Sequence, residues 1–316
     1  MEYRNLGMTD LRISAVSFGC WAMGGVWWGK VDDDESIAAV RRALDLGVNF
    51  FDTADVYGFG HSEEILQKAL GNRRNQVYVA TKGGLEWDEN NNIRPNNNRA
   101  HVVSAAEASL RRLKTDAIDL YQIHWPDPKI PIAETATACL ELLNSGKVRA
   151  IGVSNFSASQ MAEWRAVAPL HSLQPPYSLL ERGVEDETLP YCLENKIGVI
   201  LYSPLQRGIL TGKFTADSKF GSDDLRSGDR GYQGEEFKRN LAIVEELKRV
   251  AAKASKTVGQ LAIAWVLSNP AVTSAIVGAK RPSQVEENVG GAGWALTEAQ
   301  KAGIEQILAR GGQPGD

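Results

Sequence analysis

The chain has 316 residues, of which 43% are hydrophobic and 23% charged, and its net charge is −4. That balance is typical of a globular protein and argues against nucleic acid or a membrane surface as partners. No stretch approaches the roughly 20 apolar residues of a membrane span, and the first residues lack a signal peptide's apolar core. Cys20, Cys139 and Cys192 are too widely spaced for a disulfide framework or a metal site, so we expect reduced thiols and a cytoplasmic location.

Short apolar runs alternate with amphipathic segments along almost the whole chain. After an N-terminal β-hairpin at 1–14, strands are expected at 15–19, 48–52, 77–81, 118–123, 150–154, 172–174, 198–202 and 273–277. Helices are expected at 32–46, 62–70, 99–113, 130–144, after a cap at Ser157, at 187–194, 237–253 and 258–267, and from Pro282 and Thr297. This order predicts a single α/β domain over 1–316, a (β/α)8 TIM barrel with extra C-terminal helices and a frayed tail at 311–316.

An open, doubly wound sheet is the alternative fold. Its dinucleotide-binding form would carry a glycine fingerprint on the first strand-to-helix turn. The nearest match, Gly58-Phe59-Gly60, lacks the third glycine and follows the second strand, so we interpret it as chance.

Two segments interrupt the regular spacing. We expect the Asn-rich segment 86–98 to be a solvated loop or a substrate rim, and the long segment 203–236 to be a functional lid.

Polar residues recur where the expected strands end. They are Asp52, Lys82, His124, Ser154 with Asn155, Gln174, and Tyr202 with Ser203, while Tyr57 closes the turn after Asp52. Each alone has a structural explanation, such as a turn cap or a satisfied core histidine. A barrel, however, brings the carboxyl ends of its strands together around one mouth, which favours a functional site.

A tyrosine with an ordinary pKa of about 10 is a poor proton donor at neutral pH. The Lys82 ammonium would favour the phenolate of Tyr57 and lower its pKa, while Asp52 would keep the lysine charged. His124 could orient a carbonyl or share the proton. No nucleophile elbow is present, and with only four histidines in the chain we expect no metal site.

Several motifs in order resemble the aldo-keto reductases. They are 51–58 (FDTADVYG) with Ser62-Glu63, Ala80-Thr81-Lys82, 122–126 (QIHWP), 152–156 (GVSNF), Tyr202-Ser203-Pro204-Leu205 and Gly278-Ala279-Lys280. The resemblance spans essentially the whole chain. It implies a (β/α)8 barrel that binds a nicotinamide cofactor without a Rossmann motif.

The resemblance also implies roles for individual residues. Tyr57 would be the general acid/base tuned by Asp52 and Lys82, and His124 would position the carbonyl. The implied cofactor-binding residues are Ser154, Asn155 and Gln174 at the carboxamide, Tyr202 under the nicotinamide, and Ser203, Leu205, Gly208, Lys213 and Arg226 in the cofactor loop 203–236.

At the adenosine end the sequence departs from the commoner family signature, a lysine-serine pair with a later arginine. The chain has Gly278, Lys280, Arg281, Gln284, Glu287 and Asn288 there, as in the potassium-channel β-subunit branch and its bacterial relatives. Two cations at a helix start suit a 2′-phosphate, so NADP(H) is favoured and NAD(H) stays open.

The expected partner is a small carbonyl compound or sugar. Five tryptophans near the mouth could stack on a sugar or an aromatic aldehyde: Trp21, Trp27, Trp28, Trp87 and Trp125. The leading hypothesis is an NADP-dependent carbonyl reductase, or an alcohol dehydrogenase in reverse. A nucleotide-binding regulatory subunit with slow turnover is the main alternative, and a Schiff-base aldolase using Lys82 is weaker. Monomer or homo-oligomer, physiological substrate and direction stay open.

Overall fold

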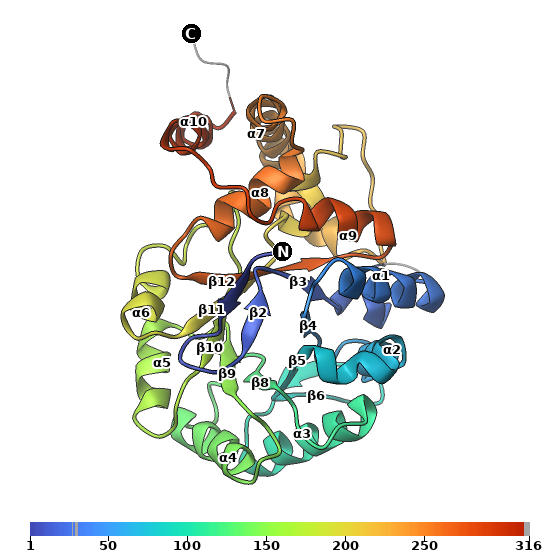
Figure 1. The fold of residues 1–316 in the computed structure, drawn as a ribbon, viewed down its shortest axis with the longest axis vertical. Coiled ribbons are helices and arrows are strands. Elements are labelled where there is room, and N and C mark those ends of the chain that lie inside the picture. Colours follow the sequence, from blue (N-terminus) through green and yellow to red (C-terminus); the bar gives the residue numbers. More distant parts are fainter. Residues whose placement is uncertain (27, 29–30, 313–316) are drawn as a thin grey trace.

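Parallel strands close into a barrel in the computed structural model, which describes residues 1–26, 28 and 31–312 (Figure 1). The barrel strands are β3 (Val16–Gly19), β4 (Phe50–Asp52), β5 (Tyr78–Gly83), β8 (Leu120–Ile123), β9 (Ile151–Ser154), β10 (Ser172–Gln174), β11 (Gly198–Tyr202) and β12 (Val272–Gly278). They neighbour one another in that order, and β12 pairs back onto β3. The predicted (β/α)8 fold is therefore confirmed, with every barrel strand within about two residues of its expected position.

Helices surround the strands on the outside of the barrel (Figure 1). They are α1 (Asp33–Asp45), α2 (His61–Leu70), α3 (Arg99–Leu113), α4 (Ile132–Asn144), α5 (Ala158–Arg165), α6 (Thr188–Glu194), α7 (Gly234–Ala252), α8 (Val258–Leu267), α9 (Pro282–Val289) and α10 (Glu298–Ala309). Capping boxes at Ser157 and Thr297 start α5 and α10, as the sequence predicts. The helices α7 and α10 pack on each other beyond the ring, while α9 packs on α1 where the barrel closes.

The N-terminal hairpin closes one end of the barrel. Its strands β1 (Tyr3–Asn5) and β2 (Arg12–Ser14) pair antiparallel. Leu6, Leu11 and Ile13 are fully buried and form one apolar cluster with interior barrel residues such as Phe50 and Ile200. Because this plug fills the end at which the strands begin, ligands have access from the opposite end.

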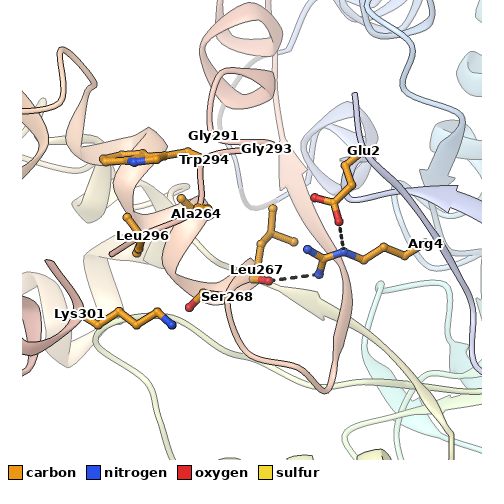
Figure 2. Close-up of a pocket in the computed structure, with 11 residues that line it drawn as sticks. Glu2, Arg4, Ala264, Leu267, Ser268, Gly291, Gly293, Trp294, Leu296 and Lys301 are labelled. Carbon is orange, nitrogen blue, oxygen red and sulfur yellow. Dashed lines mark hydrogen bonds and ion pairs between the residues drawn. The ribbon is translucent and has the colours of Figure 1, made fainter. Parts of the chain in front are cut away.

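Arg4 fixes the hairpin to the turn between α8 and β12 (Figure 2). Its Nη1 atom donates to the carbonyl oxygens of Leu267 (3.1 Å) and Val272 (2.8 Å), and its Nε atom donates to Glu2 Oε1 at 2.8 Å. Glu2, Arg4 and Leu267 line a hollow of about 350 Å³, together with Trp294 and Lys301. The guanidinium is committed to holding the plug in place, so we interpret the hollow as structural.

Two connections differ from simple loops. The segment expected to be a solvated excursion contains an antiparallel hairpin, β6 (Leu85–Trp87) and β7 (Ile93–Pro95), so the loop expectation for 86–98 is wrong over those strands. Leu85, Trp87 and Ile93 pack in the apolar cluster around Tyr57, which stabilises the hairpin despite the asparagines. The segment 203–236 contains short 3-10 turns, η3 (Gln206–Thr211), η4 (Leu225–Gly228) and η5 (Arg230–Tyr232), followed by the start of α7. Further 3-10 turns are η1 (Trp21–Gly24) and η2 (Gly71–Gln76).

Among the described residues, no helix combines the length and the apolar character needed to cross a membrane.

Asp119 is a buried carboxylate that joins three neighbouring parts of the barrel. Its Oδ2 atom accepts from Arg74 Nη2 (2.8 Å) and from the backbone N–H of Val79 (3.0 Å), and its Oδ1 accepts from Arg149 Nη1 at 2.9 Å. Removing it leaves a buried N–H and two guanidiniums without this partner.

We therefore expect Asp119→Ala to lower the free energy of unfolding by about 3 kcal/mol in chemical denaturation. The matched control is Asp116→Ala, because Asp116 is exposed on the preceding turn. The control should change stability by less than about 0.5 kcal/mol. Equal effects of the two variants would contradict the structural role assigned to Asp119.

Candidate active site

A cavity of about 750 Å³ lies at the carboxyl ends of the strands, opposite the hairpin plug. It is lined by a residue at or just after each barrel strand: Gly19, Asp52, Leu85, His124, Ser154, Gln174, Tyr202 and Gly278. The strand-end residues singled out in the sequence therefore do converge. Lys82 is the exception, because its fully buried side chain lies behind this wall.

The turn after β4 is tied to the neighbouring strand β5. The backbone N–H of Thr53 donates to Ala80 O (2.9 Å), and that of Asp55 donates to Lys82 O (3.2 Å). Gly58 has a φ of +62° and lies against the backbone of Gly24, where any Cβ would collide. This turn carries Tyr57 to the cavity wall over the end of Lys82.

All three N–H bonds of the Lys82 ammonium have partners. Nζ donates to Asp52 Oδ2 at 2.7 Å, to Thr53 O at 3.0 Å and to Tyr57 Oη at 3.3 Å. Asp52 is also buried, and its other oxygen, Oδ1, accepts from Gln174 Nε2 at 2.7 Å. The result is a water-excluded chain from an amide through a carboxylate and an ammonium to a phenol.

Within this hydrogen-bonded group, the pKa of Tyr57 differs from the sequence expectation. Burial raises the pKa of Tyr57 to about 12, and the opposing influence of Lys82 is too small to cancel it. The expectation that Lys82 brings the pKa of Tyr57 below its ordinary value is therefore wrong. Burial also opposes the charge of Lys82, but Asp52 and Tyr57 outweigh it and raise the lysine pKa. Near neutral pH the phenol is protonated and the lysine charged.

His124 stands beside Tyr57 as a neutral imidazole. The two rings meet edge to face with centroids 5.7 Å apart. Burial, followed by the charge of Lys82, lowers the pKa of His124 well below its ordinary value. Its Nδ1 atom has no hydrogen-bond partner among the described residues, which favours the tautomer that carries the proton on Nε2. A neutral N–H donor beside a phenol can hold a carbonyl oxygen.

A second hydrogen-bonded group lies on the strands β9, β10 and β11. Ser154 Oγ donates to Gln174 O (2.8 Å), and Asn155 Nδ2 donates to His124 O (3.1 Å) and Ser154 Oγ (3.0 Å). Tyr202 Oη donates to Asn155 Oδ1 at 2.9 Å. These amide and hydroxyl groups fit a carboxamide, and the Tyr202 side chain lines the same cavity.

The far end of the cavity is cationic. Lys213, Arg226 and Lys280 line it together with Ser203, Leu205 and Gly208. Burial and the charge of Arg226 lower the pKa of both Lys213 and Lys280, so these cations destabilise one another in the absence of an anion. Arg226 Nε is partly neutralised by Asp224 Oδ1 at 2.8 Å. A donor set of this kind fits the phosphates of a dinucleotide.

The residues predicted at the adenosine end divide into two groups. Gly278, Gln284, Glu287 and Asn288 line the cavity. Gln284 Oε1 accepts from the backbone N–H of Lys280 at 2.7 Å, and Asn288 Nδ2 donates to Gly278 O at 3.3 Å. Arg281 does not line the cavity, because its exposed side chain faces Glu35 with Nε 3.6 Å from Oε2.

The other end of the cavity is aromatic and apolar. Trp21, Trp28 and Trp125 line it, whereas Trp87 lies outside it with its ring 5.5 Å from that of Phe59. Trp27 lies outside the described residues. Lys280 Nζ donates to Trp28 O at 2.7 Å, so this end is linked to the cationic end.

Sequence reasoning did not name several lining residues, among them Arg207, Leu85 and Ile93. Arg207 stands within the recognised loop motif, where its charge was a usable signal, and it pairs with Asp229. Leu85 and Ile93 come from the β6–β7 hairpin; Ile93 lies in the segment 86–98, for which a substrate rim is the second interpretation, but neither residue is singled out in the sequence.

Comparisons with known proteins identify the family of this chain. The family model described as Aldo/keto reductase family matches residues 15–309. The aldo-keto reductase YhdN of Bacillus subtilis is 47% identical over 98% of this chain and 94% of its own length. A solved structure of a glycerol dehydrogenase from Gluconobacter oxydans is 44% identical, with a TM-score of 0.92 over 99% of this chain and 97% of its own.

Two further relatives are described differently. An NADH-specific methylglyoxal reductase of Escherichia coli is 37% identical over 93% of this chain and 94% of its own length. A probable voltage-gated potassium channel β-subunit of Arabidopsis thaliana is 36% identical over 92% of this chain and 90% of its own. The match of a family model over nearly the whole chain, together with these identities, establishes that this protein belongs to the aldo-keto reductase family.

Proposed function

We propose that this protein is an NADP-dependent oxidoreductase that interconverts a small aldehyde, ketone or sugar and its alcohol, with Tyr57 as general acid/base. The observation that carries the proposal is the buried Lys82 ammonium, held 2.7 Å from Asp52 Oδ2 and 3.3 Å from Tyr57 Oη at the wall of a cavity with a cationic end. This arrangement serves proton transfer to an oxygen in the cavity.

In the proposed reduction, His124 donates a hydrogen bond that orients the carbonyl oxygen beside Tyr57. The Tyr57 phenol then gives its proton to that oxygen, and Lys82 stabilises the resulting phenolate at short range. Asp52 keeps the lysine charged and fixes its position. The nicotinamide, when bound, supplies or accepts the hydride. Ser154, Asn155 and Gln174 would hold its carboxamide, and Tyr202 would contact the ring.

The cofactor preference rests on charge. Lys280 and Lys213 are cations in an environment that disfavours their charge, and a 2′-phosphate would relieve that repulsion. This supports NADP(H) over NAD(H). Arg281 lies outside the cavity and adds no support in the described conformation, and the methylglyoxal reductase relative is described as NADH-specific.

A nucleotide-binding regulatory subunit with slow turnover is the second candidate, favoured by the similarity to a channel subunit. The Schiff-base alternative is weakened by the state of Lys82. An amine nucleophile must be neutral and accessible, whereas this one is fully buried, fully bonded and held charged.

We expect Tyr57→Phe to lower kcat for aldehyde reduction by about 1,000-fold, because the proton donor is lost while the cavity keeps its shape. The measurement is NADPH oxidation with a panel of aldehydes and ketoses, with nucleotide affinity followed separately. Tyr78→Phe is the matched control, since Tyr78 lies at the opposite end of β5. Equal activity of wild type and Tyr57→Phe would overturn the mechanism. A wild type that binds NADPH tightly but turns over none of the panel would favour the regulatory candidate.

The pH dependence should differ between the two directions. Because the pKa of Tyr57 is raised to about 12, the phenol stays protonated from pH 6 to 9, and reduction should show no break there that is due to Tyr57. Oxidation needs the phenolate, whose fraction grows about tenfold per pH unit below the pKa. We therefore expect kcat/KM for alcohol oxidation to rise throughout that range. A plateau beginning near pH 7 would contradict the raised pKa.

Cofactor discrimination should depend on Lys280. We expect Lys280→Ala to weaken NADPH binding about tenfold, or ~1.4 kcal/mol, and to affect NADH much less. Dissociation constants from nucleotide fluorescence would measure both. Lys68→Ala serves as the control, because Lys68 is an exposed lysine of α2. If both nucleotides weakened equally, Lys280 would be acting on a group they share rather than on the 2′-phosphate.

A further inference from the structure

The β6–β7 hairpin packs its inner face on the turn that carries Tyr57. Trp87 stands opposite Ile93 in the hairpin register, and Leu85 lies two residues before Trp87, so alternation places all three on one face. Trp87 contacts the ring of Phe59. Leu85, Val56 and Tyr57 form one apolar cluster, with Ile93 packed against it. The hairpin is thus part of the wall around the proton donor.

Its outer face and tip are held by polar contacts. Glu86 Oε2 accepts from Asn96 Nδ2 at 2.6 Å, and Glu86 Oε1 pairs with Arg94. At the tip, Asp88 Oδ1 accepts the backbone N–H groups of Asn90 (2.8 Å) and Asn92 (2.9 Å). These contacts fix the hairpin on both faces, so the positions of Leu85 and Ile93 at the cavity are defined.

The charges of the cavity are segregated along its length. On the side of the hairpin it is lined by apolar and aromatic residues: Trp21, Ala22, Trp28, Val56, Leu85, Ile93 and Trp125. The ionisable groups from the opposite side are Arg207, Lys213, Arg226, Lys280 and Glu287. The Lys82 ammonium behind Tyr57 is already paired with Asp52, and the buried Asp55 and Glu63 do not line the cavity. The cations Arg226 and Lys280 come no nearer to this side than Trp28, which they contact, so among the described residues the part of the wall formed by Leu85 and Ile93 presents no charged group to an anion.

We propose that the β6–β7 hairpin is a specificity element, in which Leu85 and Ile93 admit the uncharged body of an aldehyde and exclude an anionic one. This inference rests on the proposed function, because it takes Tyr57 as the place where the carbonyl sits. A carboxylate beside this wall would lose water without gaining a partner, whereas a flat apolar group would pack between Ile93 and the indoles.

The test compares two aldehydes of similar shape, benzaldehyde and 4-carboxybenzaldehyde. For the wild type we expect kcat/KM to favour benzaldehyde by about 100-fold. Ile93→Lys supplies a cation at the wall and should narrow that ratio by about tenfold or more. Ile93→Met, which keeps the wall apolar, should preserve the ratio.

A control variant separates a direct contact between the new lysine and the substrate carboxylate from a long-range effect of the protein's net charge. Glu89 is exposed at the hairpin tip, so Glu89→Gln changes the net charge by the same amount as Ile93→Lys but outside the cavity. It should leave the ratio unchanged. A wild type that reduces both aldehydes equally well, or an Ile93→Lys variant with the wild-type ratio, would overturn the proposal.

A binding measurement keeps this result apart from the fate of the proposed function. Quenching of tryptophan fluorescence gives dissociation constants for both aldehydes with NADP⁺ present. If neither aldehyde were reduced, the proposed function would fail for this substrate class, yet the order of the two dissociation constants would still decide whether the wall excludes the anion. Equal dissociation constants would overturn the specificity role even in an active enzyme.

Discussion

The ion pair between Lys82 and Asp52 is the constraint on which the site depends. An ammonium with no solvent contact would be strongly destabilising alone, so the fold must supply a carboxylate, a carbonyl and a phenol around it. Those three groups come from β4 and the turn after it, while the lysine comes from β5. The pairing of these strands and the closed barrel therefore hold the proton donor in place, and a change in strand register would dismantle it.

Much of this arrangement could be predicted from the sequence. Apolar runs that stop at Asp52 or Tyr202 mark strand ends, and the capping residues Ser157 and Thr297 mark helix starts, because such signals are local. The convergence of strand-end residues then follows from barrel closure alone. The order of the strands along the chain, together with the assumption that they close into a barrel, identifies most of the residues that line the cavity.

What could not be predicted depends on long-range packing. The asparagines of 86–98 indicate a loop, yet Leu85 and Ile93 find an apolar surface on a turn about 30 residues away in the chain and form strands. The pKa of Tyr57 is set by how deeply its hydroxyl is buried, which spacing does not reveal. Arg281 and Trp87 have the right chemistry and position in sequence, but local backbone direction takes both side chains away from the cavity.

The hydrogen bond from Gln174 Nε2 to Asp52 Oδ1 joins the hydrogen-bonded group on β9, β10 and β11 to the buried ion pair behind Tyr57. Gln174 belongs to the group expected to hold the carboxamide, and Asp52 is the counter-ion of Lys82. One carboxylate therefore contacts both the Gln174 amide and the Lys82 ammonium. Three consecutive hydrogen bonds connect the Gln174 amide to the Tyr57 hydroxyl through Asp52 and Lys82. Were a carboxamide bound at Gln174 to shift the equilibria of this hydrogen-bonded group, thermodynamic reciprocity would require the protonation of Tyr57 to shift the binding of the carboxamide by the same free energy.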